Sequence, residues 1–428
     1  MLLRSRIFIN SIFMIICYSF IVLNTGMAVE THIDQFMPAS TPNTSGSGGR
    51  AHGMNGAFIS VADDGTASYW NVACLDNLLK KEFSIVTNLS HRIEKMKFDY
   101  KRTGNGPQTI SILNLNHMSY SYPFFGKLFY FLPEAHHVFS INYQQQYDFT
   151  KKWNFSRMLH VENIKYTDAI DYQSEGKLST IGLAYSVLIR ENISFGVVFN
   201  IWDNDITHNK WEQTNYQERK QGNTLREKAL LKELNEFKGY NANFGLLFRN
   251  IFKNNGLYKV NMGVVLKTPF HAKIDKTKSF VSSTTEHSII TEKHTLKMPV
   301  SYGLGTALVS NDFNCALDIY RTEWNGFFDT DPTLVVRLGY EYLHKKGHYV
   351  LPFRCGFSYD PSPAEGTIDK FWNISIGSGV ELINHFSFDI AYQFRFANNV
   401  NGSILKSMNF SQDIREHTLY SSLILYFN

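Results

Sequence analysis

Apolar and polar residues alternate one by one along several stretches of the chain. Between positions 386 and 396, the even positions carry Phe, Ile or Tyr, whereas the odd positions carry Ser, Asp, Ala, Gln or Arg. Positions 334–342, 349–359 and 372–382 repeat this alternation. Successive side chains of a β-strand point to opposite faces, so a period of two predicts strands with one apolar and one polar face.

An apolar strand face can be the core side of a soluble sandwich or the lipid-facing side of a transmembrane barrel. The predicted strands are about 9 to 12 residues long, which suits a tilted strand that crosses a bilayer. Aromatic residues also gather at strand ends, where the interfacial girdles of a barrel would lie. Both features favour the barrel. The aromatic residues in question are Tyr340, Tyr342, Tyr349, Tyr359 and Phe386.

The predicted connections alternate between short and long, which is the pattern of periplasmic turns and external loops in outer-membrane barrels. We therefore expect an all-β fold, a transmembrane antiparallel β-barrel of about 14 strands with both ends on the periplasmic side. The short turns are 190–192, 250–256, 310–312, 344–348 and 383–385, and the long connections are 150–176, 206–239, 268–298 and 398–416. The strands are expected near 83–100, 109–119, 137–149, 177–189, 193–205, 240–250, 257–267, 299–309, 313–324, 333–343, 349–359, 371–382, 386–397 and 417–427.

The N-terminus has the layout of a secretory signal peptide. Arg4 and Arg6 precede a mostly apolar run at 7–23, and Gly26 and Ala28 supply the small residues of a cleavage site. The alternative is a retained signal anchor. We expect residues 1–28 to be a cleaved signal peptide, residues 29–81 an N-terminal lead and hatch, and residues 82–428 the barrel.

Composition excludes several classes of protein. Lys and Arg number 42 and Asp and Glu number 38, a net charge of +4 that is too balanced for a nucleic-acid-binding chain. The 34 Phe, 23 Tyr and 6 Trp argue against disorder. The mean hydropathy of −0.23 is too low for a polytopic helical membrane protein. The same mean hydropathy suits a barrel, in which every lipid-facing residue alternates with a polar one.

Catalytic and metal-binding signatures are lacking in the sequence. It contains no phosphate-binding loop, no H-E-x-x-H and no nucleophile elbow. Cys74, Cys315 and Cys355 follow the expected cleavage site without CxxC or metal-ligand spacing. We therefore expect neither an enzyme nor a cofactor nor a metal site.

Residues 48–75, GGRAHGMNGAFISVADDGTASYWNVACL, form a distinctive glycine- and alanine-rich unit. They resemble the N-terminal hatch of the outer-membrane long-chain fatty acid and aromatic hydrocarbon transporter family (the FadL/TodX family, which includes OmpP1-like proteins). Its pattern runs G-x-x-A-x-G-M-G-G-A-F, V-A-D-D-x-x-A and W-N-P-A-G-L. Here Asn55 and Cys74 replace glycines and Val72 replaces the proline. Residues 298–305 and 354–363 resemble two further family segments, P-x-S-Y-G-x-G and Y-D-x-S-P, so the resemblance extends over most of the chain.

The resemblance implies a passive transporter in the outer membrane of a Gram-negative-type bacterium, with a hydrophobic small molecule as its ligand. Relatives pass long-chain fatty acids or aromatic hydrocarbons into the barrel and release them by hatch movement or through a lateral gate. Outer-membrane lipid and the barrel-assembly machinery are the other expected partners, and nucleic acid is not one. Two alternatives stay open: a non-transporting barrel that serves a secretion system as a partner or cargo shuttle, and a general porin.

Candidate site residues lie in two places. In the hatch we single out Phe58, Trp70, Asn71 and Ala73. Trp70 and Asn71 could contact substrate, and the alternative, which we favour, is that they anchor the hatch to the barrel wall. Asp63 and Asp64 precede Gly65 and predict a turn in which carboxylates accept local backbone N–H groups, with a bound cation as the minor alternative.

The second place is the predicted third strand. Phe139, Ile141, Tyr143, Tyr147 and Phe149 would share its outward face, interrupted by Gln145 within the run Gln144, Gln145 and Gln146. Such a polar gap on the lipid face is a candidate lateral gate. The alternatives are a position in the headgroup zone or a shift of register at that point.

Four further expectations concern single segments. Leucines between 225 and 237 at helical spacing predict an amphipathic helix in the second long loop. His136 and His137 are expected to be solvated at a periplasmic turn. The terminal strand 418–427, with its aromatic Phe427, resembles the signal read by the barrel-assembly machinery. Five charges on polar strand faces are expected to line the barrel as ion-pair partners, with a clamp for a ligand carboxylate as the alternative: Arg337, Glu341, Arg354, Asp389 and Arg395.

Overall fold

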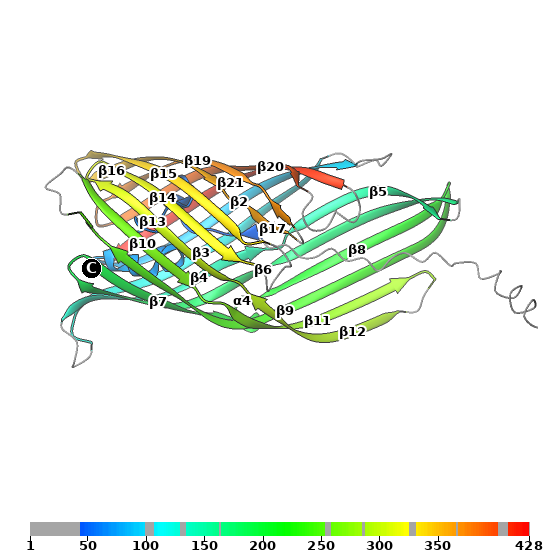
Figure 1. The fold of residues 1–428 in the computed structure, drawn as a ribbon, viewed down its shortest axis with the longest axis horizontal. Helices are drawn as coiled ribbons and strands as arrows, with labels where there is room; N and C mark the ends of the chain where they lie inside the picture. Colours follow the sequence, from blue (N-terminus) through cyan, green and yellow to red (C-terminus); the bar gives the residue numbers. More distant parts are fainter. Residues whose placement is uncertain are drawn as a thin grey trace, which may run out of the picture.

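The computed structural model describes residues 43–98, 107–128, 134–161, 164–252, 258–284, 287–324, 331–364, 367–400 and 410–427. The predicted signal peptide at 1–28 and the lead up to residue 42 lie outside these described residues. Long antiparallel strands dominate the part of the chain that is described (Figure 1). No helix among the described residues is long and apolar enough to cross a membrane.

Fourteen strands pair in sequence order to form a closed antiparallel barrel, in which the last strand pairs with the first over its whole length. Each of them overlaps one of the fourteen predicted strands, so the predicted architecture is confirmed. They are β2 (Lys81–Phe98), β3 (Gln108–Gly126), β4 (Ala135–Asp148), β6 (Ile164–Arg190), β7 (Ile193–Trp202), β9 (Thr224–Phe248), β10 (Tyr258–Lys267), β13 (Val300–Ser310), β14 (Phe313–Glu323), β15 (Thr333–Lys346), β16 (Tyr349–Tyr359), β19 (Trp372–Leu382), β20 (Phe386–Val400) and β21 (Phe410–Phe427).

The alternation in sequence is an alternation between the outside and the lumen. In β20, Phe388, Ile390 and Tyr392 are exposed on the outer surface, whereas Asp389 and Ala391 are buried inside. The same outward apolar face continues on β14, β15, β16 and β19. A water-soluble barrel would bury these side chains, so this surface is suited to lipid.

The three long connections at 150–176, 206–239 and 268–298 are strands rather than irregular loops. β5 (Lys151–Val161) pairs with β6, β8 (Lys210–Gln221) pairs with β6 and β9, and β11 (Phe270–Ser282) pairs with β9 and with β12 (Ser288–Met298). Together they prolong one side of the barrel beyond its rim (Figure 1). We call this six-stranded region the external sheet.

The amphipathic helix predicted between 225 and 237 is wrong, because this segment is the first half of β9. Leu231 and Phe237 are buried on the inner face of the external sheet, together with Glu233 and Asn235. Polar residues therefore occur on the buried face, and this obscured the period of two in the sequence. Pairing with β8 and β11 on both sides overrides the helical spacing of the leucines.

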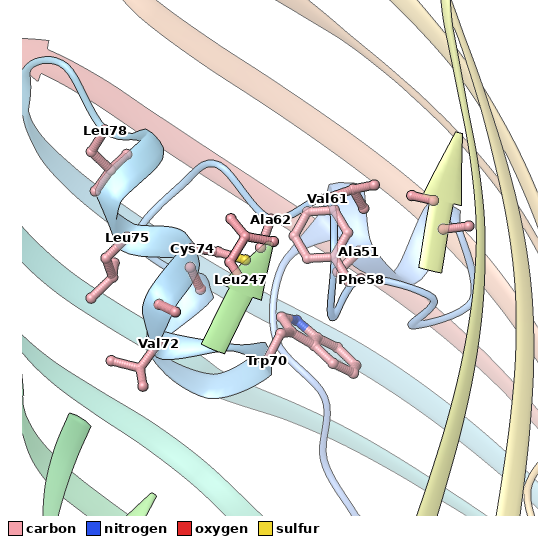
Figure 2. Close-up of a cluster of buried hydrophobic side chains, with 14 of the residues drawn as sticks. Ala51, Phe58, Val61, Ala62, Trp70, Val72, Cys74, Leu75, Leu78 and Leu247 are labelled. Atoms are coloured by element: carbon pink, nitrogen blue, oxygen red, sulfur yellow. The ribbon is translucent and has the colours of Figure 1, made fainter. Parts of the chain in front are cut away.

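Residues 45–78, which we call the lumen segment, lie inside the barrel. They contain α2 (Gly49–Gly53), α3 (Ala67–Trp70) and the 3-10 helix η1 (Val72–Asn77), and they follow β1 (Asn43–Thr44), which pairs with β4. Figure 2 shows their apolar side chains packed together against Leu247 of the wall. The remaining short elements are α4 (Asn204–Thr207), β17 (Ser362–Ala364) and β18 (Thr367–Asp369).

Candidate functional site in the lumen

Local turns give the lumen segment its shape. Gly48, with φ of 91°, leads into α2 in a conformation that L-residues rarely adopt. Asp64 accepts a hydrogen bond from the backbone N–H of Thr66 at 2.8 Å, which confirms the predicted turn. Asp63 has a different role, because its carboxylate pairs with the guanidinium of Arg50.

A chain of buried charges joins the lumen segment to the wall. The guanidinium of Arg50 makes two 2.8 Å hydrogen bonds to the two carboxylate oxygens of Glu341 on β15. Arg354 on β16 donates to Glu341 at 2.7 Å and to Asp389 on β20 at 2.6 Å. Glu341, Arg354 and Asp389 are therefore ion-pair partners, as predicted. These bonds are charge-assisted and mostly shielded from water, so they hold α2 firmly.

Two of the predicted hatch residues are structural. Phe58 is fully buried, and its backbone N–H donates to the Asp318 carboxylate on β14 at 2.7 Å. Asn71 donates to the carbonyl oxygens of Ile59 and Leu246, and so ties the lumen segment to β9. Neither side chain lines the cavity described next.

Ala73 is also buried in packing. A Cβ atom at Gly196 of β7 or at Gly245 of β9 would lie within 3 Å of its backbone nitrogen. The hydroxyl of Ser186 on β6 donates to its carbonyl oxygen at 3.0 Å. Ala73 therefore marks a point where the 3-10 helix touches the wall directly.

Trp70 is the predicted hatch residue that faces open space. It lies on the wall of a cavity of about 1660 Å³, including the part open to solvent, between the lumen segment and the external end of the barrel. Its indole N–H donates to the carbonyl of Ser47 at 2.7 Å, so it is also anchored within the lumen segment. The aromatic residues around the cavity are Tyr69, Trp70, Tyr147, Trp202, Phe270, Tyr320, Trp324 and Tyr420.

His52 forms part of the same wall. Its imidazole stacks on Tyr420 of β21 with ring centroids 3.5 Å apart, and meets Trp70 edge-on at 6.1 Å. Burial, reinforced by the nearby guanidinium of Arg337, lowers the pKa of His52 from 6.5 to about 3. His52 is therefore neutral at physiological pH and presents an aromatic surface.

Two cations on the cavity wall lie over aromatic rings. The ammonium of Lys267 is 4.2 Å from the ring centroid of Tyr69. The guanidinium of Arg337 lies 5.6 Å from the Trp70 ring and 6.0 Å from Tyr320. Among the described residues Arg337 has no carboxylate within ion-pair distance, contrary to the prediction, and its aromatic contacts are of the cation–π kind. Arg395, which also lines the cavity, pairs with Glu416 at 3.4 Å.

An apolar cluster at the root of the external sheet borders the cavity on its outer side. Trp202, Phe270 and Met298 belong to both. Trp202 stacks on Phe270 with centroids 5.5 Å apart and meets Phe237 edge-on. The cavity is thereby connected to an aromatic region that extends toward the external end. The other buried members of this cluster are Phe149, Leu178, Trp211, Ala272 and Ile274.

The predicted gate residues form a β-bulge. Gln145 pairs with Ser179 and Tyr147 with Leu178, which leaves Gln146 as an extra residue in β4. An extra residue moves the side chains beyond it to the opposite face. The register shift considered above is therefore what the structure shows.

The bulge corrects the faces predicted for β4. Phe139 and Ile141 are exposed on the outer surface, as predicted. Gln145 is not on the lipid face, because its side chain is buried and its amide lies 3.4 Å from the hydroxyl of Ser45. Tyr147 and Phe149 point inward as well, into the apolar cluster.

The two neighbouring histidines do not project freely into solvent as predicted, since His137 is buried and His136 is half-buried. His136 bonds to the Asp76 carboxylate of the lumen segment at 2.7 Å. His137 is buried and bonds to the Tyr185 hydroxyl at 2.8 Å. Asp76 also accepts from Ser194 and Arg249, so it joins η1 to three strands. Sequence reasoning missed this junction, because its members are 60 to 173 positions apart.

Comparison of the fold with solved structures places it among known barrels. A FadL homologue from Pseudomonas aeruginosa superposes with a TM-score of 0.61 at 10% identity, covering 91% of this chain and 100% of the other. The P. putida toluene transporter TodX gives a TM-score of 0.55 at 13% identity over 90% and 100%.

The chain has the FadL fold. The Ralstonia pickettii toluene transporter TbuX shares it, with a TM-score of 0.52 at 11% identity over 90% of this chain and 100% of that one. No family model matches the sequence, and no curated protein does. The likeness that the motif at 48–75 indicated is therefore borne out through the fold.

Proposed function

We propose that this FadL-fold protein is a passive outer-membrane transporter for hydrophobic or amphiphilic compounds, such as long-chain fatty acids or aromatic hydrocarbons. The observation that carries the proposal is a large aromatic-lined cavity in the lumen, closed on its inner side by the lumen segment. The toluene transporters with the same fold support it. A role in transport also fits a protein that is not an enzyme.

The ligand enters through the apolar cluster at the root of the external sheet. Trp202 and Phe270 form part of both the cluster and the cavity, so an apolar molecule can pass from one to the other along their aromatic surfaces. In the cavity it contacts Trp70 and Tyr320. Burial of apolar ligand surface, at about 25 cal/mol per Å², drives the binding.

The lumen segment acts as the hatch, and the bulge of β4 is the lateral gate. Gln146 lies on the cavity wall and its amide reaches the hydroxyl of Thr180 on β6 at 3.3 Å. A bulge replaces regular ladder pairing, so β4 and β6 are held less tightly there. The ligand leaves sideways at this point or past the lumen segment, down its own gradient. Outer-membrane lipid then receives it.

Biogenesis follows the proposed location. The exported chain inserts through the barrel-assembly machinery, which reads the terminal strand β21 with Phe427. This strand closes the barrel by pairing with β2 from Phe410 to Phe427.

Uptake measurements test the proposed release route. Deleting Gln146 regularises β4, and we expect it to reduce uptake of labelled toluene and labelled long-chain fatty acid in cells that depend on this protein. The matched control is Gln146→Ser, which keeps the extra residue and should keep uptake. Heat-dependent gel mobility verifies that both variants fold as barrels.

Two outcomes count against the proposal. If cells with the wild-type protein take up neither compound faster than cells without it, transport of hydrophobic compounds is refuted. If wild-type uptake is present and the deletion leaves it unchanged, the gate at β4 is refuted and release occurs past the lumen segment.

A further inference from the structure

The lumen segment meets two different kinds of wall. From β7 round to β19, it touches glycines: a Cβ at Gly196, Gly263, Gly339 or Gly356 would lie within 3 Å of its backbone. These contacts are direct. The same side carries the ion pairs of Arg50 and the hydrogen bonds that the Asp318 carboxylate accepts from the backbone of Phe58 and Ile59.

The wall formed by β2, β3 and β4 is largely polar, although Val138 of β4 packs in the apolar cluster of the lumen segment. β2 and β4 contain no glycine, and the hydroxyl of Ser119 lies against Gly65. Along this wall Ser84, Asn116, His117 and Ser119 are each at most 2% exposed, and each has a side-chain nitrogen or oxygen without a hydrogen-bond partner. One carboxylate oxygen of Glu82 is likewise buried without a hydrogen-bond partner.

Such groups make this contact costly. A buried polar atom that loses its water without gaining a partner costs about 1–3 kcal/mol. Hydration would recover that cost along the whole row, whereas fewer side chains of the glycine wall have such an atom, namely Asn314 and Asp318 of β14 and Asn373 of β19. The free energy recovered when water enters is therefore largest at the interface between the lumen segment and β2–β4.

The contacts that hold the lumen segment on this side are few in the described part of the wall. Glu82 accepts from the backbone N–H of Gly65, and His136 bonds to Asp76. At the outer end, the backbone N–H of Ser45 donates to the carbonyl of Gln146 at 2.9 Å, and the amides of Gln144 and Gln145 reach Gly46 and Ser45 at 3.4 Å.

The polar row runs from the cavity to the opposite end of the barrel. Its outer end is next to Gln146, which lines the cavity, and Gln144 bonds across to His117 at 2.9 Å. Its inner end is Glu82, close to the start of β2 and to the chain's C-terminus, at the end with the short turns (Figure 1).

We propose that the interface between the lumen segment and β2–β4 opens into a hydrated passage that conducts water and small hydrophilic solutes. Hydrophobic compounds follow a separate route. They leave the barrel at the bulge, and they do not pass along the polar row. The lumen segment stays fixed to the glycine wall while the passage is open.

A disulfide placed across this interface tests the proposal. The Cβ positions at Gly65 and Ser119 are 3.5 Å apart, within the range of a natural disulfide. The pair Gly65→Cys and Ser119→Cys is made in the full chain after its native cysteines have been replaced by alanine. Conductance is measured in planar lipid bilayers in potassium chloride, before and after oxidation, and mass spectrometry verifies the crosslink.

The matched control locks the opposite side. The Cβ positions at Ala57 and Gly339 are 3.1 Å apart, slightly closer than in a natural disulfide, and the pair Ala57→Cys and Gly339→Cys ties the lumen segment to β15. A Cβ at Gly339 also meets the backbone of Met54, so the reduced pair is the baseline for its own oxidised form. We expect oxidation to abolish conductance in the first pair, reducing agent to restore it, and the control pair to conduct in both states.

Three results would overturn the proposal. The wild-type protein could show no conductance; the oxidised Gly65–Ser119 pair could conduct as before; or both crosslinked pairs could lose conductance alike, which would mean that the lumen segment leaves as a whole. None of these results bears on uptake of hydrophobic compounds, which is measured separately.

Discussion

Glu341 is the residue on which the attachment of the lumen segment depends most. It is fully buried and binds Arg50 of α2, Arg354 of β16 and the amide of Asn314. One buried carboxylate thus pairs with two guanidinium groups, each of which has a second carboxylate partner in Asp63 or Asp389. The alternation in sequence places Glu341 and Arg354 on polar strand faces and predicts that each is an ion-pair partner inside the barrel. Arg50 could not be predicted as a partner of Glu341, because the two residues are 291 positions apart in the sequence.

Replacing Glu341 by Gln should loosen α2. Removing one partner of a buried ion pair typically costs about 3–5 kcal/mol. We expect hydrogen exchange of amides 49–56 to show an opening free energy lower by that amount. Glu323→Gln, which affects the rim pair with Arg321, is the control and should change it by less than about 1 kcal/mol. Equal effects of both variants would contradict the assigned role of Glu341.

His52 should make the attachment of α2 dependent on pH. The pKa of His52 is about 3 in the folded state and near 6.5 once exposed, so below pH 6.5 the open state binds a proton that the folded state does not. Stability is thus fully present above pH 6.5 and is lost as pH falls toward 3. Between pH 7 and pH 5 the opening free energy of amides 49–56 should fall by about 2 kcal/mol.

The control for this prediction is His52→Gln, which removes the titrating group and keeps a polar side chain. Hydrogen exchange at the two pH values, corrected for intrinsic rates, measures the difference. A decrease of the same size in His52→Gln would assign the pH dependence to another group.

At the scale of elements, strand positions could be predicted and the external sheet could not. In β20 the two faces differ sharply because one meets the outside and the other the lumen, so a period of two is visible. In β9 the inner face carries Glu233 and Asn235 as well as Leu231 and Phe237, so the pattern is blurred. The bulge at Gln146 was also hidden, because a one-residue shift changes the face but not the composition.

The glycines of the wall have a role that their number in the sequence does not reveal. At Gly356 of β16, an added Cβ would lie 2.5 Å from the carbonyl carbon of Met54. Gly356→Ala should therefore cost about 1–3 kcal/mol through overpacking. We expect the temperature at which the purified barrel loses its compact gel mobility to fall.

Gly126→Ala is the control for Gly356→Ala. An added Cβ at Gly126 meets its nearest atom only at 3.9 Å, which is an ordinary van der Waals contact. It should leave the unfolding temperature unchanged. An equal decrease in the two variants would mean that glycine is needed for the strand backbone itself rather than for contact with the lumen segment.

At the scale of the whole molecule, the barrel combines an apolar outside, an aromatic cavity and an obstructed lumen. The motif at 48–75 allowed the obstruction to be predicted, and the structure shows how it is held: by ion pairs, by Asp318 and by backbone contact with glycines. Of the predicted hatch residues, Trp70 lines the cavity, whereas Phe58, Asn71 and Ala73 secure the segment. The apolar cluster of the external sheet had no counterpart in sequence, because its members come from distant strands.

The central claim is that the cavity binds an apolar molecule, and bromine labelling tests it most directly. Crystals of the protein soaked with bromotoluene, or with a brominated long-chain fatty acid, should give an anomalous bromine peak inside the barrel, between Trp70 and Tyr320. Trp70→Ala should weaken that peak at the same soaking concentration. Bromine found only on the outer, lipid-facing surface, with none in the lumen, would contradict the account.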